Sequence, residues 1–256
     1  MQRKIISIIL YVFIFTAGIS GQELPDWFTP LRDAVYNQVL SSTEVSRLYD
    51  TARERATREL SGTPLLIMLS RCEYMMGRSF LLDNKENEAA PCFERGMAYA
   101  QEVLDQKETS EAWEMLAENL SYYCTLKSWG FVLINGPKVE RHSNKAVDID
   151  AGNTAALFLI AARYIYAPAP FHNYRKGQRI LEDILQNYNH RLQKDVRFNV
   201  YTGMGYLCIE RKNNEEAKSW YSKALELYPD NIEFKTLYSD LIQHGDSTKR
   251  FRFKKR

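Results

Sequence analysis

Apolar residues recur at intervals of three and four positions through most of the chain, which is the period of an amphipathic α-helix. The pattern is clearest between Tyr201 and Pro229. A first helix carries Tyr201, Met204, Gly205 and Cys208 on one face, and a second carries Ala217, Tyr221 and Ala224. The run Pro229-Asp230-Asn231 then stops the second helix. This segment therefore predicts a helical hairpin, which cannot bury its own apolar faces and needs stacked neighbours.

The same spacing divides the chain into successive helical units. We expect a helix pair at residues 22–63, a less regular hairpin at 64–108, two units with insertions at 109–151 and 152–197, the best-formed unit at 198–230, and a capping helix at 231–245. Ser41 and Glu44 have the spacing of a helix-starting capping box. Trp113, Leu157 and Tyr201 occupy equivalent positions in three successive units. The predicted fold is all-α, with almost no strand.

The N-terminus has the order of a secretory signal peptide. Arg3 and Lys4 precede an apolar run from Ile5 to Phe15, and small residues follow up to Gly21. The apolar run is short for a membrane span, although an uncleaved anchor helix is the alternative. Because no cysteine lies near the cleavage region, we do not expect lipoprotein attachment. Residues 1–21 therefore predict export, to the periplasm or out of the cell.

Charge is distributed unevenly along the chain. The net charge of +2 hides a mildly acidic body and a basic tail at residues 246–256, in which six basic residues alternate with Phe251 and Phe253. Such a tail can bind an anionic membrane surface or an acidic partner, or it can be a disordered solubilising segment. Nucleic acid is not an expected partner for an exported protein.

The residues that carry chemistry are sparse. The four cysteines, Cys72, Cys92, Cys124 and Cys208, include no Cys-x-x-Cys pair, and we expect buried free thiols, with Cys72 and Cys92 as the one pair to test. The four histidines lack metal-ligand spacing, and no motif for a nucleophile or a phosphate loop is present. We therefore expect no enzyme activity, no cofactor and no metal site.

The residues of the 198–230 unit resemble the tetratricopeptide repeat family, and residues 110–187 resemble it more weakly. The resemblance implies a right-handed superhelix of antiparallel helix pairs, whose concave face is lined by the first helix of each pair and commonly receives a peptide. The outline is also similar to the periplasmic repeat component of some tripartite transporters. That second likeness is architectural, and no motif fixes it.

Two insertions are rich in aromatic residues, one at residues 128–137 and the other at 164–174. If equivalent turns of a solenoid stack on one edge, these loops form one aromatic rim that could bind a partner. The candidate partner-binding residues are Trp129, Phe131, Tyr166, Phe171, His172 and Tyr174. The alternative is that the rings only fill gaps between hairpins.

These observations favour a non-enzymatic scaffold of the bacterial cell envelope that binds a protein or peptide segment along its concave face. The alternative is an accessory component of a periplasmic transport system that handles a small ligand. The shape of the groove should discriminate between them. A long polar channel favours a peptide, and an enclosed aromatic pocket favours a small ligand.

Overall fold

The computed structural model describes residues 24–244, which form eleven α-helices, two short 3-10 helices and no strand. The signal peptide expected at 1–21 and the basic tail at 246–256 lie outside the described residues. The 3-10 helices are η1 (Asp26–Phe28) and η2 (Asn189–Arg191). The α-helices are α1 (Thr29–Asn37), α2 (Ser42–Glu59), α3 (Gly62–Leu82), α4 (Glu86–Gln106), α5 (Ser110–Thr125), α6 (Trp129–Ile149), α7 (Thr154–Tyr166), α8 (Tyr174–Asn187), α9 (Lys194–Glu210), α10 (Asn214–Leu227) and α11 (Ile232–His244).

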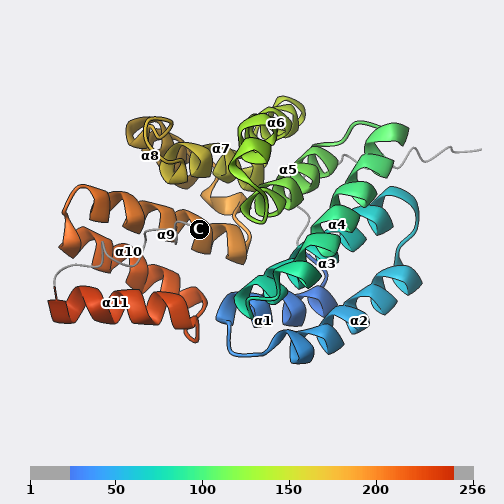
Figure 1. The fold of residues 1–256 in the computed structure, drawn as a ribbon, viewed down its shortest axis with the longest axis horizontal. Coiled ribbons are helices and arrows are strands. Elements are labelled where there is room, and N and C mark those ends of the chain that lie inside the picture. The colour runs from blue at the N-terminus through green and yellow to red at the C-terminus, as the bar shows by residue number, and fades with distance from the viewer. Residues whose placement is uncertain (1–23, 245–256) are drawn as a thin grey trace, which may run out of the picture.

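Consecutive helices pack as hairpins along a curved stack (Figure 1). Within the hairpins, α3 packs on α4, α5 on α6, α7 on α8 and α9 on α10, and α4 also packs extensively on α5 of the next hairpin. The first helices of these pairs also contact one another in order, α3 with α5, α5 with α7 and α7 with α9. The all-α, repeat-type solenoid expected from the sequence is confirmed, and the capping box at Ser41 and Glu44 is present at the start of α2.

The hairpins approach closely because small residues face large rings. Gly205 on α9 lies directly against the ring of Tyr221 on α10, and a Cβ at this position would overlap that ring. Tyr221 is fully buried. The glycine is therefore required by the close approach of the two helices.

The N-terminal hairpins are held together by a buried carboxylate as well as by apolar contacts. Glu73 on α3 is fully buried. It accepts hydrogen bonds from the hydroxyl of Tyr49 at 2.6 Å, from Arg53 at 3.2 Å and from Arg95 at 2.7 Å. These donors come from α2 and α4, so the carboxylate ties three helices together. A buried charge is tolerated here because it is paired and hydrogen-bonded.

The first and last parts of the stack meet through α1 (Figure 1). The ring of Tyr36 on α1 stacks on Tyr228, with centroids 4.9 Å apart, and meets Phe198 on α9 edge-on. Asn231 donates a hydrogen bond to the carbonyl of Tyr36, and Lys194 pairs with Asp33 at 2.7 Å. Because α1 also contacts α3, it bridges first helices at both ends of the stack. Part of the face that the first helices line is therefore occupied by α1.

One predicted loop is instead helical. Residues 128–137 were expected to form an insertion loop, but α6 begins at Trp129 and continues through Pro137. A proline inside a helix removes one hydrogen bond and crowds the carbonyl four residues earlier, so packing must offset that cost. The helix is held on both sides of the proline, by Phe131 and Val132 packed against a core cluster and by the buried Val139. In the second insertion, residues 167–173 do connect α7 to α8.

The four cysteines are all free and buried, including Cys72 and Cys92. Burial raises the pKa of each thiol, to about 12 for Cys72 and to about 11 for Cys92 and Cys208, and it also raises that of Cys124. The thiolate is the reactive form of cysteine. These thiols are therefore protected from reagents because they are buried and because they stay protonated.

The close approach at Gly205 makes a prediction about stability. Gly205→Ala should lower the free energy of unfolding by about 1–3 kcal/mol, because the added carbon must displace a buried ring. Gly130→Ala on α6 is the matched control, since a Cβ added there would have no neighbouring atom within 4 Å. The control should be neutral or more stable by up to about 1 kcal/mol. Urea unfolding followed by circular dichroism measures both, and equal midpoints would contradict the packing described.

The cysteines make a second prediction. Ellman's reagent at about pH 8 should react slowly with the folded protein and should titrate all four thiols once guanidinium has unfolded it. Rapid release of one equivalent from the folded protein would show an accessible thiol. Fewer than four thiols in denaturant without reductant would show a disulfide.

Candidate functional site

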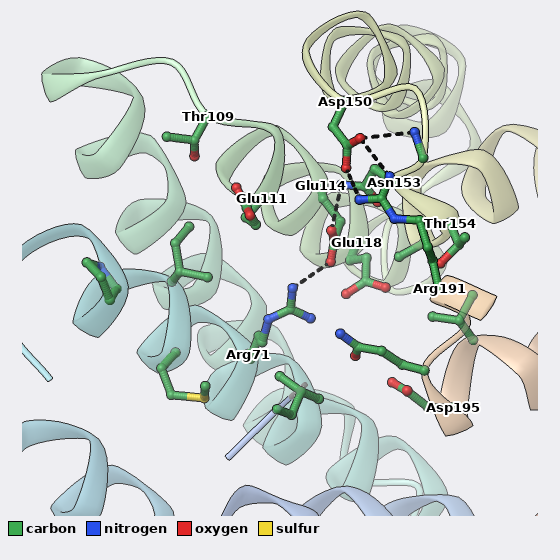
Figure 2. A pocket seen from close by; sticks show the side chains of 18 of the residues that line it. Arg71, Thr109, Glu111, Glu114, Glu118, Asp150, Asn153, Thr154, Arg191 and Asp195 are labelled. Atoms are coloured by element: carbon green, nitrogen blue, oxygen red, sulfur yellow. Dashed lines mark hydrogen bonds and ion pairs between the residues drawn. The ribbon is translucent and has the colours of Figure 1, made fainter. Parts of the chain in front are cut away.

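A pocket of about 480 Å³ opens among the first helices of the stack (Figure 2). Its walls come from α3, from α5, from the turn before α7 and from the start of α9. The lining includes five carboxylates and two guanidinium groups: Glu111, Glu114, Glu118, Asp150, Asp195, Arg71 and Arg191. As far as residues 24–244 describe it, the wall contains no aromatic ring. The pocket thus combines an acidic set of charged groups with apolar wall residues such as Ile67, Met68 and Val196.

Glu114 is the centre of the hydrogen-bond network in this pocket. It is buried on α5, and Arg71 on α3 pairs with it at 2.8 Å. The amide nitrogen of Asn153 donates to its other oxygen at 2.8 Å, while the amide oxygen of Asn153 caps the start of α7. Burial raises the pKa of Glu114, and Arg71 opposes that rise. The network therefore fixes the relative positions of α3, α5 and α7.

A second ion pair closes one edge of the pocket. Arg191 pairs with Asp150 at 2.8 Å, between the end of the 109–151 unit and the start of α9. Gly152 lies against this guanidinium, and a Cβ at that position would overlap it. Glycine therefore leaves the space in which Arg191 reaches across to Asp150.

Two further carboxylates face the pocket and differ from Glu114 in lacking such a partner network (Figure 2). Asp195, on the first turn of α9, is 8% exposed, and its Oδ1 atom is buried without a hydrogen-bond partner. Glu118 lies one turn after Glu114 on α5 and is partly buried. Loss of solvent raises the pKa of Glu118 to about 8, helped by the charges of Glu114 and Asp195 and opposed by Arg71.

The six aromatic-rim residues do not line this pocket, and their ring contacts fall into two groups. Phe131 packs edge-on against Tyr123 at 5.7 Å. Tyr166 and Tyr174 both contact Tyr206, and His172 stacks on Tyr174 at 4.5 Å. The two most exposed members, both more than half exposed, are Trp129 and Phe171.

The carboxylates of the pocket were not among the candidate residues expected from the sequence. Glu114 and Glu118 are four residues apart on the first helix of a repeat, so they share one face of that helix. Arg71 interrupts the apolar run of α3, which is a position where a charge needs a partner. These two features were the available indications of a charged inner face.

The arrangement is suited to binding a positive charge. Within the described part of the chain, no group of three His, Cys, Asp or Glu side chains is placed to hold a metal ion.

None of the helices between residues 24 and 244 is both long enough and apolar enough to cross a bilayer.

Glu118 makes a prediction about pH and stability. Because its folded-state pKa lies above the ordinary value of 4.5, the unfolded chain loses this proton first, and stability falls as the pH rises from about 4.5 to about 8. Glu118→Gln should flatten this part of the curve and raise the free energy of unfolding at pH 8, by up to about 1.4 kcal/mol for each unit of pKa shift.

The control is Glu102→Gln, which changes an exposed carboxylate on α4 and should leave the curve unchanged. Urea unfolding at a series of pH values checks both variants. A Glu118→Gln curve parallel to that of the wild type would contradict the environment described for this carboxyl group.

Comparison with known families adds one match, at the hairpin where the sequence pattern is clearest. Residues 198–231 match a family model described as a tetratricopeptide repeat. The match begins inside α9, includes α10 and ends at Asn231, the residue before α11. No curated protein matches the chain. Tetratricopeptide repeats generally mediate protein–protein interaction, and their stacked helices provide the surface for it. Residues 198–231 of this all-helical chain therefore form a tetratricopeptide repeat.

Proposed function

We propose that this protein is a non-enzymatic scaffold of the bacterial cell envelope and that it holds a segment of another protein. The matched repeat supports a role in protein–protein interaction, and the all-helical repeat fold is typically non-catalytic. The signal-peptide pattern at residues 1–21 is the basis for the envelope location.

The observation that carries the proposal is the pocket on the first helices. These helices form the recognition surface of a stacked-repeat protein, and here they bring polar groups from four hairpins together. Protein segments present backbone amides and charged side chains, which carboxylates, guanidinium groups and amides such as Asn153 can recognise. An enclosed aromatic pocket would favour the small-ligand alternative, whereas the described wall of this pocket has no ring.

The exposed start of α6 offers a second contact area. Trp129, Leu133 and Ile134 are between 51% and 71% exposed, and they belong to the first two turns of one helix. Large exposed apolar residues grouped in this way are typical of interaction surfaces. Trp129 remains a proposed partner contact, and Phe131, Tyr166, Phe171, His172 and Tyr174 remain proposed with it.

A photo-crosslinking experiment in cells tests the scaffold proposal. The residue p-benzoylphenylalanine is placed at Glu111, where it lines the pocket, and in a matched variant at Glu102, an exposed carboxylate on α4. Irradiation should give a covalent adduct with another protein at position 111 and none at 102, because only the pocket holds the partner segment. Mass spectrometry of the purified adduct identifies the crosslinked peptide.

The same probe at Trp129 tests the contact area on α6, with Ile242 on α11 as a control of equal exposure, 56%. A protein adduct at 129 and none at 242 would support this contact. Absence of any protein adduct at both 111 and 129 would overturn the scaffold proposal. Equal adducts at all four positions would show only non-specific collision.

A further inference from the structure

Two carboxylates in the pocket face a region that the neighbouring cations do not fill. Asp195 is one of the residues that line the pocket and is more than nine-tenths buried, and its buried Oδ1 atom has no hydrogen-bond partner. Leaving a buried acceptor unpaired is costly, whereas pairing it with a charged donor is strongly favourable. Figure 2 shows Glu118 and Asp195 on opposite elements, α5 and α9, facing the same space. The two side chains thus define a place where a cationic donor could pair with both of them.

Three of the nearby guanidinium groups are paired with other carboxylates. Arg71 pairs with Glu114, and Arg191 pairs with Asp150. Arg32 interacts electrostatically with Asp195, but it forms its ion pair with Asp33, at 2.9 Å. Arg78 lies over the rings of Tyr36, Tyr74 and Tyr122, and its Nη1 atom is buried without a hydrogen-bond partner. The pocket lining as a whole has more carboxylates than guanidinium groups.

We propose that Glu118 and Asp195 form a subsite for the cationic end of a lysine or arginine side chain, supplied by the protein segment that the scaffold binds. This inference rests on the proposed function and adds the chemistry of the partner. An ammonium or guanidinium group placed between the two carboxylates would donate hydrogen bonds to both. Ile67, Met68 and Val196 in the same wall provide apolar surface for the methylene stem of such a side chain.

The subsite couples binding to protonation. Glu118 faces Arg71 and Arg78 from α3, Glu114 from its own helix, and Asp195 from α9, and together with burial they hold its pKa at about 8. A cation binds the ionised carboxylate, so binding must displace the proton. Affinity should therefore rise between about pH 6 and about pH 8, and protons should be released on binding.

The test uses the mature protein, ¹⁵N-labelled, with N-acetyl-lysine methylamide and N-acetyl-arginine methylamide as probes. The matched control ligand is N-acetyl-norleucine methylamide, which has a stem of similar length and no charge. Amide shifts should map to α5 and the start of α9, and the dissociation constants of the charged probes should be smaller than that of norleucine by roughly tenfold or more. Equal affinity for norleucine would overturn the subsite.

Two variants show whether the binding depends on the named carboxylates. Glu118→Gln and Asp195→Asn should each weaken the charged probes by roughly tenfold, and Glu118→Gln should also remove the pH dependence. Glu102→Gln on α4 should change neither. Circular dichroism confirms that each variant is folded. If one variant is not folded, the other decides. Unchanged affinity in a folded variant would overturn the assignment.

Two further arms identify the source of the cation. Calcium chloride that produces the same shifts at lower concentration than lysine would overturn the assignment in favour of a metal site. Probe binding that appears only after residues 249–256 are removed would overturn the assignment to a partner, because the basic tail of this chain would then fill the subsite. A protein adduct at position 111 without lysine binding would leave the scaffold proposal intact and overturn only the subsite.

Discussion

A helical hairpin has two apolar faces and can cover only part of them by itself, and the architecture of this protein follows from how those faces are covered. Between neighbouring hairpins the first helices contact in the order α3, α5, α7 and α9. The buried residues accordingly form several clusters along the stack instead of one centre. Close contacts such as that of Gly205 with Tyr221 set the spacing within each pair. At the two ends of the stack, α1 and α11 cover the apolar faces that no neighbouring hairpin covers.

The same stacking determines the chemistry of the inner face. Arg71, Glu114 and Asp195 are far apart in the sequence, yet all three line one pocket on the first helices of the stack. Charges that would be unfavourable inside a single-centred core are tolerated here because a neighbour supplies the partner, as Asn153 and Arg71 do for Glu114. Glu118 and Asp195 are the exceptions, and they give the pocket its acidic character.

The helical repeat could be predicted from the sequence because it depends on local periodicity. The hairpin of α9 and α10 follows from residues between Tyr201 and Pro229, and their spacing alone defines its faces. The prediction was wrong at residues 128–137 because Gly130, Gly136 and Pro137 are usually helix breakers. There the packing of Phe131 and Val132 outweighs the local preference of the backbone. Neither the acidic pocket nor the contact of α1 with the last repeat could be predicted. Both depend on which helix faces meet between segments that are far apart in the sequence. Tyr36 and Asn231, for example, are separated by 195 positions.

The contact of Tyr36 with Tyr228 has a consequence for how such a chain can change in length. An open stack can gain or lose a unit by duplication or deletion, since only the new neighbours must fit. Here the ends touch, so the number of units is fixed by the curvature needed to bring α1 against α9 and α10. Inserting one more hairpin would separate these rings and expose both, and removing one would force the ends to collide. A change in the number of hairpins would therefore break the contact between the two ends.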